Sequence, residues 1–303
     1  MDILESNALR VLDILTPHIH AQRQTSSQPV ILGITGLQGS GKSTWASKVV
    51  SLLSSAFNLR AITISLDDLY KTHDDLIAQR EKNPENKLYR TRGHPGTHDE
   101  QLAEKFFAEL KAWKGEGALR IPSFDKSRFN GEGDRAPNSE WPSVSGKIDV
   151  MVFEGWCVGF RPLSESQVEA KYQAAEKSRE PAEIKDAIVT LSDHQIAHLL
   201  EINRNLKRYC DAFMGPQHFD FMIHIDTVDL HNVYRWRLQQ EYAMIKARGS
   251  GMTDDAVMAF VRGYMPAYEL YLDELRSGMF PKSGRQVRVV LGIEREVEKV
   301  ELV

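Results

Sequence analysis

Glycines and a lysine with the spacing of a phosphate-binding loop lie near residue 40. The segment GITGLQGSGKST (residues 33–44) contains Gly36, Gly41, Lys42 and Ser43 in the pattern GxxxxGKS. In such a loop, backbone N–H groups converge on phosphate oxygens, the lysine reaches the β and γ phosphates, and the hydroxyl ligates Mg²⁺. An apolar run precedes the segment and a helical pattern follows it, as the motif requires. We therefore predict a nucleotide phosphate site made of Gly36, Gly39, Ser40, Gly41, Lys42, Ser43 and Thr44.

Acidic residues follow two other apolar runs. Asp67 and Asp68 stand in SLDDLY, and Glu154 closes the run DVMVFEG. The carboxyl ends of parallel strands line the ligand crevice of an open α/β sheet, so these carboxylates are expected near the γ-phosphate. Asp67 could accept the proton of an attacking substrate hydroxyl, with helix capping as the alternative for both aspartates. Because Mg²⁺ prefers hard oxygen ligands, Ser43, Glu154 and Asp68 are its candidate ligands; a Glu154 without a role is the alternative.

Strand and helix patterns alternate around these residues. This alternation indicates an α/β fold with a doubly wound parallel sheet, here of the P-loop NTPase type. Residues 1–29 are predicted to form an N-terminal helix and linker, and residues 30–303 the nucleotide-binding domain. The predicted strands cover 30–35, 61–66, 149–155, 219–226 and 287–293, the clearest helices 43–57 and 99–113, with a long ordered loop over 119–147 and a charged helical insertion over 164–187.

The composition narrows the class of protein. The 303 residues are 42 % hydrophobic and 26 % charged, as in an ordinary globular protein. A net charge of −4 provides no general attraction for nucleic acid or an anionic membrane, so neither partner is expected. The sequence contains no run of eighteen apolar residues, and its two cysteines form no CxxC motif. We expect a cytoplasmic protein.

Taken together, the motifs resemble a known family. GLQGSGKST, SLDDLY, RGHPGTHD, PSFDKSRFNGEGDR, FEGWCVGF, YRWRLQQE and YMPAYELY occur in this order. The series is similar to the plant-type D-glycerate 3-kinases and their fungal relatives, within the wider set of phosphoribulokinase, uridine kinase and pantothenate kinase-like P-loop kinases. The resemblance extends from residue 30 to residue 293.

The resemblance implies a reaction and roles for particular residues. It implies strand order 2-3-1-4-5, a helical lid over about residues 230–265, and transfer of the γ-phosphoryl group of Mg·ATP to D-glycerate. The family's catalytic base matches Asp67, and its Walker-B-like glutamate matches Glu154. Lid arginines that grip the ATP phosphates correspond to Arg235, Arg237 and Arg248, for which a solvated helix face is the alternative.

The stretch RTRGHPGTHD (residues 90–99) first suggests a metal site, because two histidines lie four residues apart. The proline and glycine between them make a helix, and therefore a shared metal-binding face, improbable. An anion site fits better: Arg92 and the backbone near its glycines could bind a carboxylate, and His94 or His98 a substrate hydroxyl. Asp99 could instead cap the following helix. A plain Pro-Gly turn is the alternative.

The glycine-rich stretch FDKSRFNGEGDR (residues 124–135) would complete the acceptor site from the other side. Asp125, Lys126 and Arg128 are its predicted substrate-binding residues, with a solvated charged loop as the alternative. The sequence thus predicts a kinase with catalytic Asp67 and Lys42, acting on a small anionic acceptor. A kinase for a nucleoside or pantothenate-like acceptor, or a nucleotide-binding module without turnover, is the remaining alternative.

Overall fold

The structure, a computed structural model, describes residues 2–178 and 188–303, without the side chain of residue 248. Within this part of the chain, the central sheet has six strands in the order β10-β9-β8-β1-β7-β2. All neighbouring pairs are parallel except β9 with β10, which is antiparallel. The six strands are β1 (Val30–Gly36), β2 (Ala61–Ser65), β7 (Val150–Gly155), β8 (Phe221–Asp226), β9 (Gln286–Leu291) and β10 (Val297–Leu302).

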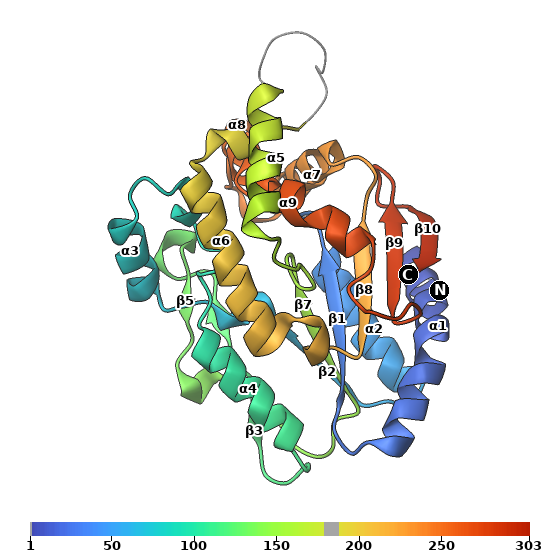
Figure 1. Ribbon diagram of the computed structural model, residues 1–303. Coiled ribbons are helices and arrows are strands. Elements are labelled where there is room, and N and C mark those ends of the chain that lie inside the picture. Colours follow the sequence, from blue (N-terminus) through green and yellow to red (C-terminus); the bar gives the residue numbers. More distant parts are fainter. Residues whose placement is uncertain (1, 179–187) are drawn as a thin grey trace.

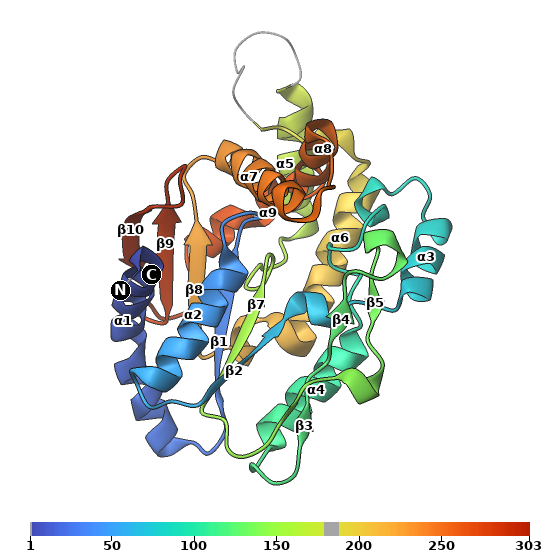
Figure 2. The same ribbon diagram turned by 180° about the vertical axis from the view of Figure 1, so that it is seen from behind.

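Helices cover both faces of this sheet (Figures 1 and 2). The first two helices lie on one face, and α4, α6 and α9 lie on the other. Two helices, α7 and α8, stand over the carboxyl ends of the parallel strands. The helices are α1 (Ile3–Thr25), α2 (Lys42–Ser55), α3 (His73–Lys82), α4 (Glu100–Ala112), α5 (Glu165–Lys177), α6 (Ile196–Tyr209), α7 (His231–Arg248), α8 (Asp254–Arg262) and α9 (Met265–Arg276).

The predicted sheet is confirmed, including its order. Numbered as predicted, the five parallel strands lie in the order 2-3-1-4-5, because β7 and β8 flank β1 on either side. Strands β1, β7 and β8 are buried along their whole length, which accounts for their uninterrupted apolar runs. The sixth strand, β10, was not predicted. Its residues are half-buried or exposed in no regular alternation, and none is fully buried, so the strand gives only a weak apolar signal at the sheet edge.

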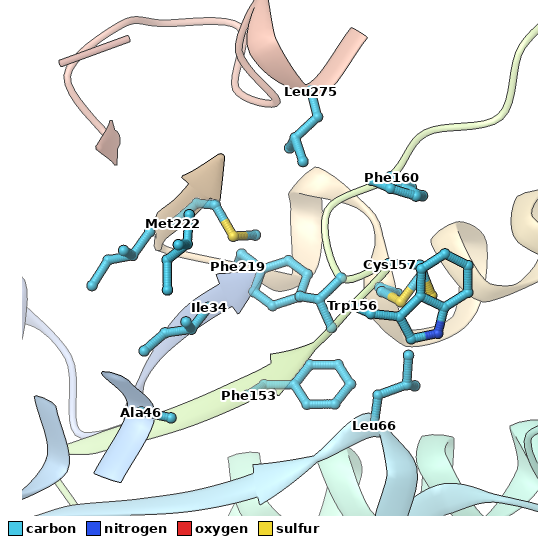
Figure 3. Packing of buried hydrophobic residues seen from close by; sticks show 14 of the residues in the cluster. Ile34, Ala46, Leu66, Phe153, Trp156, Cys157, Phe160, Phe219, Met222 and Leu275 are labelled. Atoms are coloured by element: carbon cyan, nitrogen blue, oxygen red, sulfur yellow. The ribbon is translucent and has the colours of Figure 1, made fainter. Parts of the chain in front are cut away.

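The core fills the space between the sheet and its helices. Phe153, Phe219 and Met222 pack beside one another on the face of the sheet that α9 covers, and Ile34 lies nearby on β1 (Figure 3). The close packing restricts strand β1: a Cβ atom on Gly33 would lie 2.4 Å from the methyl carbon of Met222. Such contacts fix how β1 sits between its neighbours, and hence where the loop that follows it begins.

The N-terminal helix is part of this core. Val11, Leu12 and Leu15 of α1 are fully buried, and the helix packs against α2. The linker is fastened by Arg23, which pairs with Asp149 at 3.1 Å, just before β7 begins. The predicted helix and linker therefore pack onto the domain that begins at residue 30.

Two segments, residues 119–147 and 164–187, were predicted as a long loop and as a helical insertion. Residues 119–147 form two small antiparallel sheets of two strands each: β3 (Leu119–Arg120) pairs with β6 (Ser143–Val144), and between them β4 (Phe124–Asp125) pairs with β5 (Asp134–Arg135). The predicted insertion at 164–187 begins as α5, which Ser164 and Gln167 start with a capping box. Its residues 179–187 lie outside the described part of the chain. No helix among the described residues is long and apolar enough to cross a membrane.

Candidate active site

A cavity of about 260 Å³ lies at the carboxyl edge of the sheet, under α7 and α8. Strand β1 delivers the loop at residues 37–41 to its floor, and the turn after β2 delivers an aspartate to its side. The hairpin of β4 and β5 packs beside that turn and adds Lys126 to the same side. The lining residues are Leu37, Gln38, Gly39, Gly41, Lys42, Ser43, Thr44, Asp67, Tyr70, Lys126, Trp156, Gln240, Phe260 and Tyr264.

The loop after β1 has the backbone of a phosphate cradle. Gly39 and Gly41 have φ of +80° and +85°, a region that favours glycine. A side chain at Gly39 would strike the backbone of α7, whereas a Cβ atom at Gly41 would meet nothing within 4 Å. Gly41 is also the N-cap of α2, so the helix N-terminus faces the cavity. Gly36 and Ser40, also predicted for this site, are buried beneath the loop and do not line the cavity.

Lys42, Ser43 and Glu154 meet on the floor of the cavity. The lysine Nζ lies 2.7 Å from Glu154 Oε2, and the serine hydroxyl donates to Glu154 Oε1 at 3.0 Å. Glu154 is 6 % exposed and pairs in register with Ile34, two residues before the phosphate-binding loop. The paired hydroxyl and carboxylate are hard oxygen donors, and with nucleotide phosphate oxygens they fit a divalent cation.

Asp67 faces the cavity between two proton donors. The Tyr70 hydroxyl donates to its Oδ1 at 2.8 Å, and the Lys126 ammonium donates to its Oδ2 at 2.5 Å. Burial on its own would raise the pKa of Asp67, but the charge and hydrogen bond of Lys126 outweigh it and lower that pKa to about 2. The carboxylate is therefore ionised at neutral pH and positioned to accept a proton.

Asp68, the next residue, faces away and serves the backbone. Its Oδ2 accepts from the Ser65 amide at 3.1 Å and its Oδ1 from the Phe124 amide at 3.3 Å. The first bond closes a capping box with Ser65, and the second ties β4 to the turn after β2. Burial raises the pKa of Asp68 to about 6. These contacts favour the capping alternative for Asp68 over the predicted metal ligand, because both of its oxygens already serve backbone amides.

The histidines of RTRGHPGTHD lie behind the cavity wall. His94 and His98 are 4 % and 0 % exposed, and neither lines the cavity. His94 Nε2 donates to the Gly263 carbonyl at 2.7 Å, which joins this stretch to the end of α8. Burial lowers the pKa of His94 to about 4 and that of His98 to about 3. Both rings are thus neutral and packed in the structure, where substrate contacts were predicted.

Tyr209 of α6 organises the same stretch from beneath. Its hydroxyl oxygen accepts the amides of Gly96 at 2.7 Å and His98 at 2.9 Å, and lies 3.0 Å from His98 Nδ1. Two acceptances occupy both lone pairs of that oxygen, so its own proton goes to Nδ1. His98 is thereby fixed as the Nε2–H tautomer, with its ring stacked 4.4 Å from that of Tyr70.

Two further polar residues of the stretch, Arg92 and Asp99, also have partners within the protein. Arg92 Nη1 donates to the Gly131 carbonyl at 2.9 Å and to that of Glu132 at 2.5 Å, so it holds the β4–β5 hairpin and does not line the cavity. The alternative role predicted for Asp99 is confirmed: it is the N-cap of α4, and its Oδ1 accepts from the Leu102 amide.

On the β4–β5 hairpin, the three predicted substrate residues point in different directions. Lys126 reaches the cavity, as predicted. Arg128 lies among three carboxylates, those of Asp125 at 3.4 Å, Glu140 at 3.8 Å and Asp134 at 3.9 Å. Asp125 also accepts from the amide and hydroxyl of Ser127, and those bonds lower its pKa. The acid therefore fixes the backbone beside Lys126.

Arg235 and Arg237, which were predicted for the lid, do not line the cavity. Arg235 is exposed on α7. Arg237 pairs with the buried Glu241 at 2.8 Å and lies over the ring of Phe260. The side chain of Arg248 lies outside the described part of the chain. Instead, Gln240 of α7 and Phe260 of α8 reach the cavity from this side.

Sequence reasoning missed the aromatic wall. Tyr70, Trp156 and Tyr264 line the cavity beside the acids. The Trp156 indole donates to the Gly93 carbonyl at 3.1 Å, and the Tyr264 hydroxyl donates to that of Arg92 at 3.3 Å, so the wall carries the stretch 90–99 behind it. Each ring belongs to a stretch that the sequence analysis quoted (SLDDLY, FEGWCVGF and YMPAYELY), and that is the signal that could have identified it.

Comparisons with known proteins agree on one family. The chain is 33 % identical to the solved structure of a D-glycerate 3-kinase from Cryptococcus neoformans var. grubii; the match covers 98 % of this chain and 99 % of that one, with a TM-score of 0.86. It is 35 % identical over 266 residues to an uncharacterized kinase of Schizosaccharomyces pombe, covering 88 % of this chain and 89 % of that protein.

A plant protein adds a partial match. The chain is 35 % identical over 272 residues to the chloroplastic D-glycerate 3-kinase of Arabidopsis thaliana, covering 89 % of this chain and 53 % of that protein. The chain therefore spans about half the length of this relative. No family model matches the sequence.

Proposed function

The chain belongs to the D-glycerate 3-kinase family of P-loop kinases, and from that premise we propose that it transfers the γ-phosphoryl group of Mg·ATP to D-glycerate, giving 3-phosphoglycerate. It is an ATP-dependent phosphotransferase with an alcohol acceptor. One observation carries the choice of site: a phosphate cradle and an ionised aspartate line the same cavity of about 260 Å³.

The nucleotide binds on the cradle side. Backbone amides of the loop at Gly39 and Gly41 and the N-terminus of α2 meet the phosphates, and Lys42 moves from Glu154 to the β and γ oxygens. Ser43 and Glu154 would hold the divalent cation, which we propose is Mg²⁺. When bound, it neutralises charge on the β and γ phosphates. Arg235, Arg237 and Arg248 of α7 would reach the phosphates when the helices over the cavity close.

Phosphoryl transfer takes place on the side of the cavity that carries Asp67. The primary hydroxyl oxygen of the acceptor attacks the γ-phosphorus in line, and the bond from that phosphorus to the β–γ bridging oxygen breaks. ADP leaves with the electron pair of that bond, and the hydroxyl proton passes to the Asp67 carboxylate. Tyr70 keeps the carboxylate aimed, and Lys42 stabilises the charge that spreads over the phosphoryl oxygens.

The acceptor's own charge is met by the β4–β5 hairpin. Lys126 is the predicted substrate residue that reaches the cavity, and an ammonium suits a small carboxylate. Arg92, His94, His98, Asp125 and Arg128 would then shape the acceptor site through the backbone and side chains that they hold. We also propose a cytoplasmic location, which the two free cysteines favour.

The test is ADP release by the purified protein with Mg·ATP and one acceptor at a time. D-glycerate, L-glycerate, uridine, pantothenate and a no-acceptor control form the panel. Stimulation by D-glycerate alone is expected. Stimulation by uridine or pantothenate would mean that the protein is a kinase with another acceptor. Binding of nucleotide without turnover on any acceptor would indicate a nucleotide-binding module.

A further inference from the structure

The catalytic carboxylate is not free in this structure. Both oxygens of Asp67 accept a hydrogen bond, one from the Tyr70 hydroxyl and one from the Lys126 ammonium. An ammonium at 2.5 Å makes the carboxylate a poor proton acceptor, because protonation of Asp67 would discard that ion pair. A base held in this way is ill suited to activate a water molecule or any acceptor that leaves the pair intact.

Lys126 is the partner that can leave. Its side chain is 57 % exposed, whereas that of Tyr70 is buried among aromatic rings. Asp67 is 29 % exposed, so water reaches the ion pair and screens it in part. A lysine on a four-carbon stem can swing to a new anion without moving the backbone, which the Asp125–Ser127 bonds hold in place.

The other cations near the hairpin have no such freedom. Arg128 is surrounded by three carboxylates, and Arg92 is bound by two carbonyl oxygens. Among the described residues that line the cavity, the cationic side chains are Lys42 and Lys126, and Lys42 belongs to the phosphate cradle. An anionic group on the acceptor would therefore meet Lys126.

We propose that Lys126 senses the acceptor: its ammonium covers Asp67 until a carboxylate on the acceptor draws it away, which frees Asp67 Oδ2 to take the hydroxyl proton. This inference rests on the proposed function and sharpens it in two ways. The cavity selects hydroxy acids over neutral alcohols, and hydrolysis of ATP is suppressed while no acceptor is bound. Lys126 is thus a specificity residue as well as an acceptor contact.

The experiment compares wild-type protein with Lys126→Met, Lys126→Arg and the matched control Lys105→Met. Lys105 is 75 % exposed on α4 and its ion partner is Glu109, away from the cavity, so its loss tests for a general effect of removing a surface lysine. Three rates are measured with saturating Mg·ATP: hydrolysis without an acceptor, phosphorylation of D-glycerate, and phosphorylation of glycerol, which offers similar hydroxyls without a carboxylate.

For Lys126→Met, acceptor-free hydrolysis is expected to rise about tenfold, a small part of what a well-placed general base contributes. The KM for D-glycerate is expected to rise about 10- to 100-fold, as for loss of a charge-assisted hydrogen bond, and the preference for D-glycerate over glycerol to shrink. Lys126→Arg keeps the charge and should keep hydrolysis low. Lys105→Met should match the wild type.

Two results would overturn the inference. If Lys126→Met leaves acceptor-free hydrolysis within about twofold of the wild type, Lys126 does not cover the base, even if the KM for D-glycerate rises. If wild-type protein phosphorylates glycerol at the same rate as D-glycerate, the carboxylate of the acceptor is not being sensed. Failure of the proposed function looks different: wild-type protein would then ignore D-glycerate, while the hydrolysis rates of the variants would still decide whether Lys126 covers Asp67.

Discussion

The two sides of the cavity are built on different principles. The nucleotide side, formed by the loop at residues 36–44 and Glu154, consists of neighbours in sequence plus one strand end. The acceptor side, formed by Asp67, Tyr70 and Lys126, depends on contacts between segments far apart in the chain. Residues 90–99 pack behind this side. Tyr209 of α6 and Gly263 at the end of α8 hold that stretch by hydrogen bonds.

This difference determines what each side exposes. On the nucleotide side, most residues of the motif line the cavity themselves, because a phosphate loop works through its backbone and one lysine. On the acceptor side, the polar residues that attract notice in the sequence do not line the cavity. His94 and His98 are buried, and Arg92 binds backbone carbonyls of the β4–β5 hairpin. Among the described residues, the surface that we propose faces the acceptor is aromatic, with Asp67 and Lys126 as its charged side chains.

The largest expected effect comes from a substitution on the nucleotide side. Lys42→Met should lower kcat for D-glycerate about 10³-fold, because Lys42 stabilises the charge on the transferring phosphoryl group. The same change should weaken nucleotide binding while leaving the acceptor side folded. Steady-state rates with ATP titration measure both, and an unchanged kcat would show that the cradle lysine takes no part in transfer.

A pair of glycine variants compares the packing of the two sides. At Gly96, with φ of +106°, a Cβ atom would lie 2.3 Å from the Asn205 side-chain nitrogen. Gly96→Ala should therefore lower the free energy of unfolding by about 2 to 4 kcal/mol, through backbone strain and overpacking. Gly41→Ala meets open space and carries only the strain of its positive φ, about 1 kcal/mol. Urea unfolding measures both, and equal losses would contradict the comparison.

The smallest effect concerns Asp68, which ties β4 to the turn after β2. Its pKa is about 6 in the folded protein and near 3.8 when unfolded, so the folded state binds the proton more tightly. The stability that this proton provides is complete below about pH 4 and is lost as the pH rises through 6.

The free energy of unfolding should consequently fall between pH 5 and pH 7.5 by about 1 kcal/mol more in the wild type than in Asp68→Asn, which cannot titrate. Urea unfolding at the two pH values gives both slopes. Identical slopes would mean that Asp68 titrates normally and is not held in its buried cap.

Much of the fold could be predicted because its signals are local. The buried strands read as continuous apolar runs, and the phosphate loop stands between a strand and a helix in the sequence itself. The edge strand β10 was missed because it is half exposed. The two small sheets at residues 119–147 were missed because strands of two residues are too short to show a period.

The site could be predicted only in part. Lys42, Ser43, Asp67, Glu154 and Lys126 come together as expected, since strand ends and a motif placed them. The sequence alone could not distinguish a histidine that faces a ligand from one buried against a tyrosine 111 residues away. Tyr209 lies in an amphipathic helix, and nothing in that pattern shows which loop its hydroxyl will hold.

The central claim is that Asp67 is the base for transfer to a hydroxy acid, and Asp67→Asn tests it most directly. Wild-type and variant protein are incubated with saturating Mg·ATP and D-glycerate, products are identified by ³¹P NMR, and nucleotide affinity is measured alongside. We predict 3-phosphoglycerate from the wild type, and from the variant a rate about 10²- to 10⁴-fold lower with unchanged nucleotide affinity. Formation of 3-phosphoglycerate by Asp67→Asn at the wild-type rate would contradict the account.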